Sequence, residues 1–350
     1  MLQLLKREDE MTSKHLLRST SAAFAAVVAV SGAASANEVV VYCSSPEQEC
    51  REQVERFQRD TGIDVLMTRR STGEVFALLK AEESRPRADI WLGGTDVVHL
   101  QAADDGLLAP YESPMHEHLH DWSRNLLEIS GNRTVGLFMN VLGFGYRSDI
   151  IDPESEDAPR CWADLLDERF RDDVQVANPH SSGTAYSFLT LAVHLFGEDG
   201  GMQFLKDLDN NISQYTSSGA APIRAVATGE TAVGIIFQHD ATPQIEGGAQ
   251  LHLVTPCEGS AFNANNVALV EGGPNPENAR KFYDWSLTPE ALAPVTVPFA
   301  WPAHVDAPLA EGTPELAELP LVEDFDITYF GSPETRQNLL ARWDAEVASQ

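Results

Sequence analysis

The strongest constraint on the fold is an alternation of short apolar strands and amphipathic helices near the start of the chain. Expected strands cover residues 39–42, 63–67 and 88–92, and expected helices cover 47–59, 74–83 and 96–103. Strands that alternate with helices form βαβ units, in which helices cover both faces of a parallel sheet. Such sheets bind ligands at the carboxyl ends of their strands, so the loops at 43–45, 69–73 and 93–95 are candidate binding loops.

The same α/β pattern returns after a long extended apolar segment at 134–146. Helices are expected at 162–166, 184–196 and 222–228, strands at 174–177 and 232–237, extended chain at 251–256 and 266–270, and final helices at 276–286, 289–293 and 333–348. Two α/β lobes joined by two extended segments predict a hinged protein. Lobe 1 is expected to comprise 37–138 and 262–350, and lobe 2 to comprise 139–261.

Residues 1–36 are predicted to be a secretion signal, with Met11 as its expected start. Lys14, His15 and Arg18 precede a short apolar run at 20–33, and Ala34-Ser35-Ala36 fits an A-x-A cleavage site. The alternative is an uncleaved anchor, although the apolar run is shorter than the ~20 residues that a membrane span needs. The pattern favours export to the periplasm.

Net charge and cysteine content agree with an exported protein that binds neither nucleic acid nor an anionic membrane. The formal charge is −29, which repels both over most of the surface. Cys43, Cys50, Cys161 and Cys257 make an even number, which favours disulfides outside the cytoplasm. Three pairings are possible. Cys43 with Cys50 is local and leaves Cys161 with Cys257, while buried free thiols are the alternative.

Several motifs together resemble the periplasmic substrate-binding proteins of ABC importers, in the group labelled ferric-iron binding. They are Ser44-Ser45, the turn Ser71-Thr72-Gly73-Glu74, Ala88-Asp89-Ile90-Trp91-Leu92-Gly93-Gly94, Asn178-Pro179-His180-Ser181-Ser182-Gly183-Thr184 and Gly234-Ile235-Ile236-Phe237-Gln238-His239-Asp240-Ala241. The resemblance covers residues 38–350. It implies an α/β, two-lobe type II periplasmic-binding fold, an ABC permease with its ATPase as partners, a monomer and no cofactor.

Within this group the chain resembles the binders of sugar phosphates and phosphonates more than the binders of ferric iron. Iron-binding members use two adjacent tyrosines, but the tyrosines here, at 42, 111, 146, 186, 215, 283 and 329, include no adjacent pair. Ferric iron would lose its main hard anionic ligands. In the sugar-phosphate branch a His-Asp pair and a later Glu contact sugar hydroxyls, and the resemblance assigns these roles to His239, Asp240 and Glu258.

The residues themselves also favour an anionic ligand. Small and hydroxyl-bearing residues at helix starts leave backbone N–H groups open to phosphate. The candidate ligand-binding residues of this kind are Ser44, Ser45, Ser71, Thr72, Gly73, Thr95, Ser181, Ser182, Gly183, Thr184, Ser218 and Gly219. Each alone could be an ordinary helix cap, and Ser71 with Glu74 fits a capping box.

Three other functions have to be weighed against this one. Met115-His116-Glu117-His118-Leu119-His120 could place three imidazoles on one face of a strand and bind a divalent metal, but a polar loop or a helix start is the expected role. No motif assembles a nucleophile, a base and an orienting group, so a secreted phosphatase or esterase is disfavoured. A ligand-sensing subunit of a two-component system would need the same binding site between two lobes. We therefore predict a periplasmic binding protein for a small phosphorylated anion.

Overall fold

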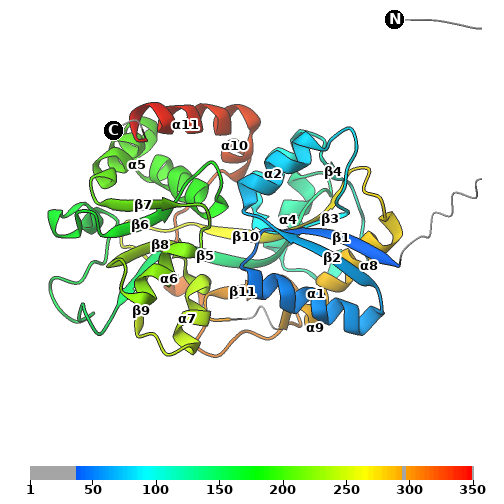
Figure 1. Cartoon of the computed structure of the whole chain (residues 1–350), viewed down its shortest axis with the longest axis horizontal. Helices are drawn as coiled ribbons and strands as arrows, with labels where there is room; N and C mark the ends of the chain where they lie inside the picture. Colours follow the sequence, from blue (N-terminus) through cyan, green and yellow to red (C-terminus); the bar gives the residue numbers. More distant parts are fainter. Residues whose placement is uncertain (1–36, 294–296, 349–350) are drawn as a thin grey trace, which may run out of the picture. The chain divides into compact units, whose positions relative to one another are not determined.

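A computed structural model describes residues 37–293 and 297–348 of the chain (Figure 1). The predicted signal at 1–36 lies outside the described residues. The strands are β1 (Glu38–Cys43), β2 (Asp64–Arg69), β3 (Ile90–Thr95), β4 (Leu108–Ala109), β5 (Val135–Arg147), β6 (Val174–Ala177), β7 (Ile212–Thr216), β8 (Val233–Phe237), β9 (Leu251–Val254), β10 (Phe262–Val270) and β11 (Ala300–Pro302).

Most helices begin and end close to their predicted limits. They are α1 (Glu47–Thr61), α2 (Thr72–Ala81), α3 (Asp96–Asp104), α4 (Asp121–Ile129), α5 (Gly183–Asp209), α6 (Ala221–Thr228), α7 (Thr242–Glu246), α8 (Pro276–Ser286), α9 (Pro289–Leu292), α10 (Ile327–Gly331) and α11 (Pro333–Glu346). α5 runs past its predicted end at Phe196, but Gly197 has φ 75° and ψ 168° there, which kinks the helix at that point.

The strands divide into two groups that share one long central strand. β1 pairs in parallel with β2 and β3, and β6 pairs in parallel with β7 and β8, as the βαβ pattern predicts. The first half of β5, Val135–Val141, pairs antiparallel with β10, whereas its second half, Leu142–Arg147, pairs antiparallel with β8 and β9. β5 therefore passes from one group of strands to the other (Figure 1).

The two strand groups give the predicted α/β, two-lobe type II fold. Its core contains Trp91 and Trp162, both buried to 1% exposure or less, and a second cluster around Phe57, Phe138 and Phe282. Burial of such large apolar surfaces is the main stabilising term of a domain this size. Among the described helices, none is both long and apolar enough for a membrane crossing.

The C-terminal helix α11 packs on α5 and its neighbours. The Trp343 ring lies 5.4 Å from the Tyr215 ring, and Arg342 forms an ion pair of 3.0 Å with Glu198. α10 instead lies against α3, where an added Cβ on Gly331 would come within 3.0 Å of Leu100. The end of the chain thus contacts elements of both strand groups.

Both predicted disulfides are confirmed. Cys43 is joined to Cys50 and Cys161 to Cys257. The first bond ties the end of β1 to the first turns of α1, so it closes a small ring that contains Ser44 and Ser45. This ring holds one of the predicted binding loops.

Candidate functional site

Four helices begin at the wall of a single polar pocket. α2, α3, α5 and α6 follow Ser71, Thr95, Ser182 and Ala220, and each of these four residues lines the pocket. The first N–H groups of a helix have no partner within the helix, and the helix dipole adds partial positive charge at the same end. Four such ends around one cavity favour an anionic ligand.

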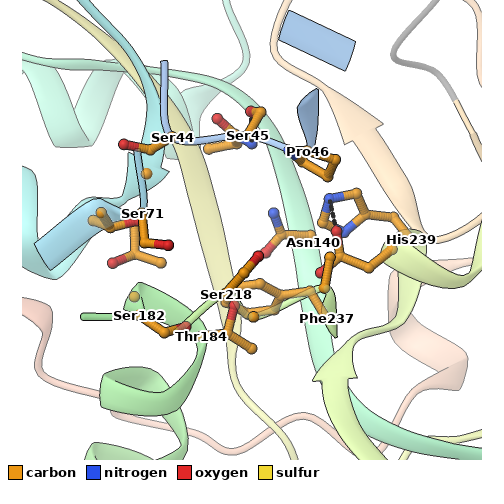
Figure 2. A pocket seen from close by; sticks show the side chains of 18 of the residues that line it. Ser44, Ser45, Pro46, Ser71, Asn140, Ser182, Thr184, Ser218, Phe237 and His239 are labelled. Atoms are coloured by element: carbon orange, nitrogen blue, oxygen red, sulfur yellow. Dashed lines mark hydrogen bonds and ion pairs between the residues drawn. The ribbon is translucent and has the colours of Figure 1, made fainter. Parts of the chain in front are cut away.

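The pocket has an empty volume of about 480 Å³, including its open mouth. Figure 2 shows Ser44, Ser71, Ser182 and Thr184 on one side, and Pro46, Phe237 and His239 on the other. The predicted residues that line it are Ser44, Ser45, Ser71, Thr72, Thr95, Ser182, Gly183, Thr184, Ser218, Gly219, His239 and Asp240.

Two of the lining glycines allow close approach between neighbouring loops. A Cβ on Gly183 would lie 2.9 Å from both Thr72 Oγ1 and Thr95 Oγ1. A Cβ on Gly219 would lie 2.0 Å from Thr184 Oγ1. A larger residue at either position would push apart the hydroxyl groups that line the pocket.

Gly73 and Ser181 do not line the pocket but contact each other beside it. The backbone N–H of Gly73 donates to Ser181 O at 2.8 Å, and Ser71 Oγ donates to Ser217 O at 2.8 Å. Ser71 and Gly73 belong to the loop after β2, whereas Ser181 and Ser217 follow β6 and β7. These two hydrogen bonds therefore link the two strand groups.

Arg69, at the end of β2, contributes a positive charge to the pocket. It donates from Nε to Ser45 O at 3.1 Å, from Nη1 to Ser71 Oγ at 3.4 Å and from Nη2 to Ser218 Oγ at 3.2 Å. Burial lowers the pKa of Arg69, while the nearby Glu74 carboxylate opposes that shift. Arg69 holds three binding loops in place in a chain that is otherwise strongly acidic.

His239 and Asp240 are buried on the opposite side. His239 Nε2 lies 3.7 Å from Asp240 Oδ1 (dashed in Figure 2). Burial lowers the pKa of His239 and raises the pKa of Asp240, with each group partly offsetting the shift of the other. Glu49 on α1 faces the same region, and burial raises its pKa to about 8, with Asp240 adding to the shift.

Several buried polar atoms of the pocket have no hydrogen-bond partner within the protein. They are Thr95 Oγ1, Asn140 Oδ1, His239 Nδ1 and Asn265 Oδ1. Unpaired buried polar atoms are costly, so a cluster of them in one pocket indicates groups that a ligand completes. The sequence analysis missed Asn140 and Asn265, which lie within the apolar strands β5 and β10.

Glu258 lies elsewhere in the structure. Its carboxylate accepts hydrogen bonds from the backbone N–H groups of Trp162 and Ala163, both at 2.7 Å. It therefore caps the short helix at Ala163–Leu166 beside the Cys161–Cys257 disulfide, and it does not line the pocket. The resemblance assigned Glu258 to the ligand, but in this structure its carboxylate is engaged by these two backbone N–H groups.

The tyrosines of the second strand group also point away from the pocket. Tyr186 Oη donates to Phe330 O at 2.8 Å, and Tyr215 Oη donates to Asp209 at 2.6 Å. Burial raises the pKa of both phenols, which disfavours the tyrosinate form that ferric iron needs. Neither tyrosine lines the pocket.

The histidine run does not form a strand with its imidazoles on one face. His116–His118 is a short 3₁₀ helix, and His120 precedes α4. His116 Nε2 lies 3.1 Å from Tyr283 Oη, and the ring of His118 stacks on that of His304. Within the described residues, the one group of potential metal ligands that converges contains the disulfide-bonded Cys161 and Cys257, whose sulfurs are already committed.

Comparison with known proteins agrees with this architecture. A Haemophilus influenzae protein of uncharacterized function is 35% identical over 345 residues, which cover 96% of this chain and 98% of that protein. The periplasmic binding protein AfuA from Actinobacillus pleuropneumoniae, solved with exogenous fructose-6-phosphate bound, superposes with a TM-score of 0.84 at 32% identity, covering 89% of this chain and 99% of AfuA.

A third relative bears on ligand chemistry. A Salmonella typhimurium protein, provisionally named 2-aminoethylphosphonate-binding periplasmic protein, is 28% identical over 251 residues, or 70% of each chain. AfuA and the Salmonella protein are both named as binding proteins.

The two-lobe fold with a polar pocket bordered by both strand groups defines the class as a solute-binding protein. The profile of the family described as bacterial extracellular solute-binding protein matches residues 86–326, and the chain belongs to this family.

Proposed function

We propose that this protein captures a small organic phosphate or phosphonate in the periplasm and delivers it to an ABC importer. The observation that carries the proposal is the meeting of four helix N-termini, with Arg69, at one hydroxyl-lined pocket. Backbone N–H groups and hydroxyls bind phosphate oxygens without a metal. AfuA, solved with fructose-6-phosphate bound, and the Salmonella protein, named for 2-aminoethylphosphonate, support this ligand class.

The other side of the pocket is proposed to bind the organic part of the ligand. The unpaired oxygens of Asn140 and Asn265, together with the Asp240 carboxylate, are acceptors for hydroxyl or ammonium hydrogens. The ring of Phe237 and Pro46 provide apolar contact beside them. The ligand would thus lie with its phosphate toward the helix starts and its hydroxyl groups toward His239 and Asp240.

We also propose that the two strand groups move as hinged lobes. Residues 37–138, 262–293 and 297–331 would form lobe 1, and 139–261 with 332–348 would form lobe 2. The packing of Trp343 on Tyr215 supports moving α11 from lobe 1, where the sequence placed it, to lobe 2. The hydrogen bonds of Gly73 and Ser71 to Ser181 and Ser217 would form on closure.

Binding without catalysis is part of the proposal, as is export through the signal at 1–36. The same two-lobe binding site could also serve a sensor subunit of a two-component system. No observation on the described residues favours a sensor over an importer. The family resemblance also suggests ferric iron as a ligand. This alternative is disfavoured, because the hydroxyls of Tyr186 and Tyr215 are hydrogen-bonded to other residues.

A thermal-shift screen tests the proposed ligand class. The panel contains fructose 6-phosphate, glucose 6-phosphate, 2-aminoethylphosphonate, phosphoglycerate and ferric citrate. A true ligand at 100 times its Kd should stabilise the fold by about 2.7 kcal/mol. Stabilisation by ferric citrate alone would contradict the proposal. Release of inorganic phosphate from a stabilising ester during incubation would contradict binding without catalysis.

A further inference from the structure

We propose that His99, which is buried behind the pocket, is a positioning residue that directs the backbone N–H of Gly94 toward a phosphate or phosphonate oxygen of the ligand. The hydroxyl of Thr95 binds the same oxyanion. This inference rests on the proposed function and refines it, because it adds to the helix starts a binding subsite at the end of β3.

The two glycines near the end of β3 leave the regular strand pairing. The register of β3 with β10 includes Leu92 and Thr95 but skips Gly93 and Gly94 between them. Both glycines have a left-handed backbone, with φ 78° and 98°. Glycine adopts this conformation without steric cost, so the peptide groups here can turn out of the ladder. Gly94 and Thr95 both line the pocket.

His99 holds the peptide between the two glycines from behind. Its ring is fully buried, and its Nε2 lies 2.9 Å from Gly93 O. Burial lowers the pKa of His99 to about 3, so the ring is neutral and carries one N–H. A carbonyl oxygen can only accept, which places this hydrogen on Nε2 and leaves Nδ1 to accept from the Thr134 hydroxyl at 2.9 Å. The donor is therefore fixed in both tautomer and direction.

This hydrogen bond determines where the N–H of Gly94 points. The peptide between Gly93 and Gly94 is trans, and in a planar trans peptide the N–H points opposite to the C=O. Because His99 holds Gly93 O on its own side, the N–H of Gly94 points away from His99. The next peptide is also held, since Asn266 Nδ2 donates to Gly94 O at 3.0 Å. Two buried side chains thus fix the backbone on either side of Gly94.

The hydroxyl of Thr95 gives independent evidence for a ligand at this place. Thr95 is 4% exposed, and its Oγ1 is buried without a hydrogen-bond partner. It faces the start of α5, where a Cβ on Gly183 would lie 2.9 Å from it. A hydroxyl can donate its hydrogen to an oxyanion, and such charge-assisted bonds are strong. Bound phosphate would therefore complete the hydrogen bonding of Thr95.

Trp91 fixes the plane of the His99 ring. The two rings stack with their centroids 3.8 Å apart and their planes 25° apart. Trp91 Nε1 also donates to Ser44 Oγ at 2.9 Å, and Ser44 lines the pocket. The stacked pair therefore holds binding groups from the ends of both β1 and β3.

A nuclear magnetic resonance titration of the full chain tests the N–H of Gly94 directly. Glycine labelled with carbon-13 at its carbonyl and nitrogen-15 at its amide gives a carbonyl-to-amide signal only where one glycine follows another, which occurs at Gly94, Gly201, Gly248 and Gly273. The last three do not line the pocket and serve as internal references. The probes are fructose 6-phosphate and 2-aminoethylphosphonate, which distinguish an ester from a phosphonate.

With the probe that binds, the amide proton of Gly94 should move downfield, as expected for a new hydrogen bond to an oxyanion, while the three reference signals stay in place. A bound probe that leaves the Gly94 signal unmoved would overturn this inference alone. If neither probe nor any other phosphorylated compound of the thermal-shift panel binds, the proposed function is overturned together with it.

Two variants separate the hydrogen bond of His99 from its packing. His99→Phe keeps a ring against Trp91 but removes the donor to Gly93 O. Because a hydrogen bond to a charged group is at stake, Kd should rise about tenfold or more, and the downfield shift of Gly94 should be lost. His99→Gln supplies a side-chain N–H again, so it should bind within about threefold of wild type and restore the shift.

His304→Phe is the matched control. His304 is also buried, its Nδ1 accepts from the backbone N–H of Asp306 at 3.1 Å, and it does not line the pocket. Both phenylalanine variants should lose stability in urea unfolding, but only His99→Phe should lose affinity. A His99→Phe protein that loses stability while its Kd and its Gly94 signal match wild type would show that His99 only packs, and would overturn the inference. The titration of the wild-type protein decides the question even if a variant does not fold.

Discussion

Replacing Gly73 with alanine should weaken ligand binding without weakening the fold. A Cβ at this position would lie 2.0 Å from His180 O, whereas real Cβ contacts essentially never fall under 3.0 Å. The loop after β2 would have to move by about 1 Å, which breaks the 2.8 Å bonds from Gly73 N–H to Ser181 O and from Ser71 Oγ to Ser217 O.

The expected loss follows from those two hydrogen bonds. At about 1 kcal/mol each, their loss costs about 2 kcal/mol of closure free energy, or about a 30-fold increase in Kd. Alanine should at the same time stabilise α2 by a few tenths of a kcal/mol, up to about 1, because glycine is a poor helix former. Affinity and stability should therefore change in opposite directions.

Calorimetry with the best ligand of the thermal-shift screen measures the first quantity, and urea unfolding of the ligand-free protein measures the second. Gly200→Ala on α5 is the matched control, since its Cβ would meet only Phe196 Cβ at 3.2 Å. A Gly73→Ala protein that binds within threefold of wild type would refute the closure contact. A large loss of stability would mean that Gly73 is needed for folding itself.

Three further results are expected. Asp240→Asn should weaken binding at least tenfold by calorimetry while leaving the Tm unchanged or higher, because burial already raises the pKa of this carboxyl; unchanged affinity would remove Asp240 from the site. Metal-free protein treated with ferric citrate and desalted should retain no stoichiometric iron, and an absorption band lost on mutating Tyr186 or Tyr215 would contradict this. Burial raises the pKa of Glu49 to about 8 from an unfolded value near 4.5, so its contribution to stability is present at low pH and is lost as pH rises toward 8. Glu49→Gln should flatten this decline in the free energy of unfolding, measured in urea at several pH values. An unaltered pH profile of the variant would exclude Glu49 as the source of the decline.

Local sequence patterns predicted the strands and helices that surround the pocket. The apolar run before His239 and the capping box at Ser71 both depend on neighbours in sequence, and both lie where expected. No range was predicted for α4 at Asp121–Ile129, although Ser123, Leu126 and Leu127 have the i, i+3, i+4 spacing of one helix face and are buried. β7 and β11 are short strands that form through pairing with distant partners.

The composition of the pocket was harder to predict, since it depends on contacts between distant segments. Asn140 and Asn265 are separated by more than a hundred residues and look like polar interruptions of strands, yet antiparallel pairing of β5 with β10 brings both to the pocket. The bond from Trp91 to Ser44 depends on the parallel pairing of β3 with β1. The predicted ligand contact of Glu258 is not supported by its position, because its carboxylate caps a short helix, a role that a Glu in such a loop can equally take.

The packing of α11 on α5 has a practical consequence. The described chain begins in β1, within one strand group, and finishes in a helix held against the other, at Trp343 and Arg342. Fluorescent proteins fused before Asn37 and after Ala348 would be attached to different proposed lobes. Energy transfer between them would then report the proposed ligand-driven closure in solution, and the chain would serve as a scaffold for an optical sensor of its ligand.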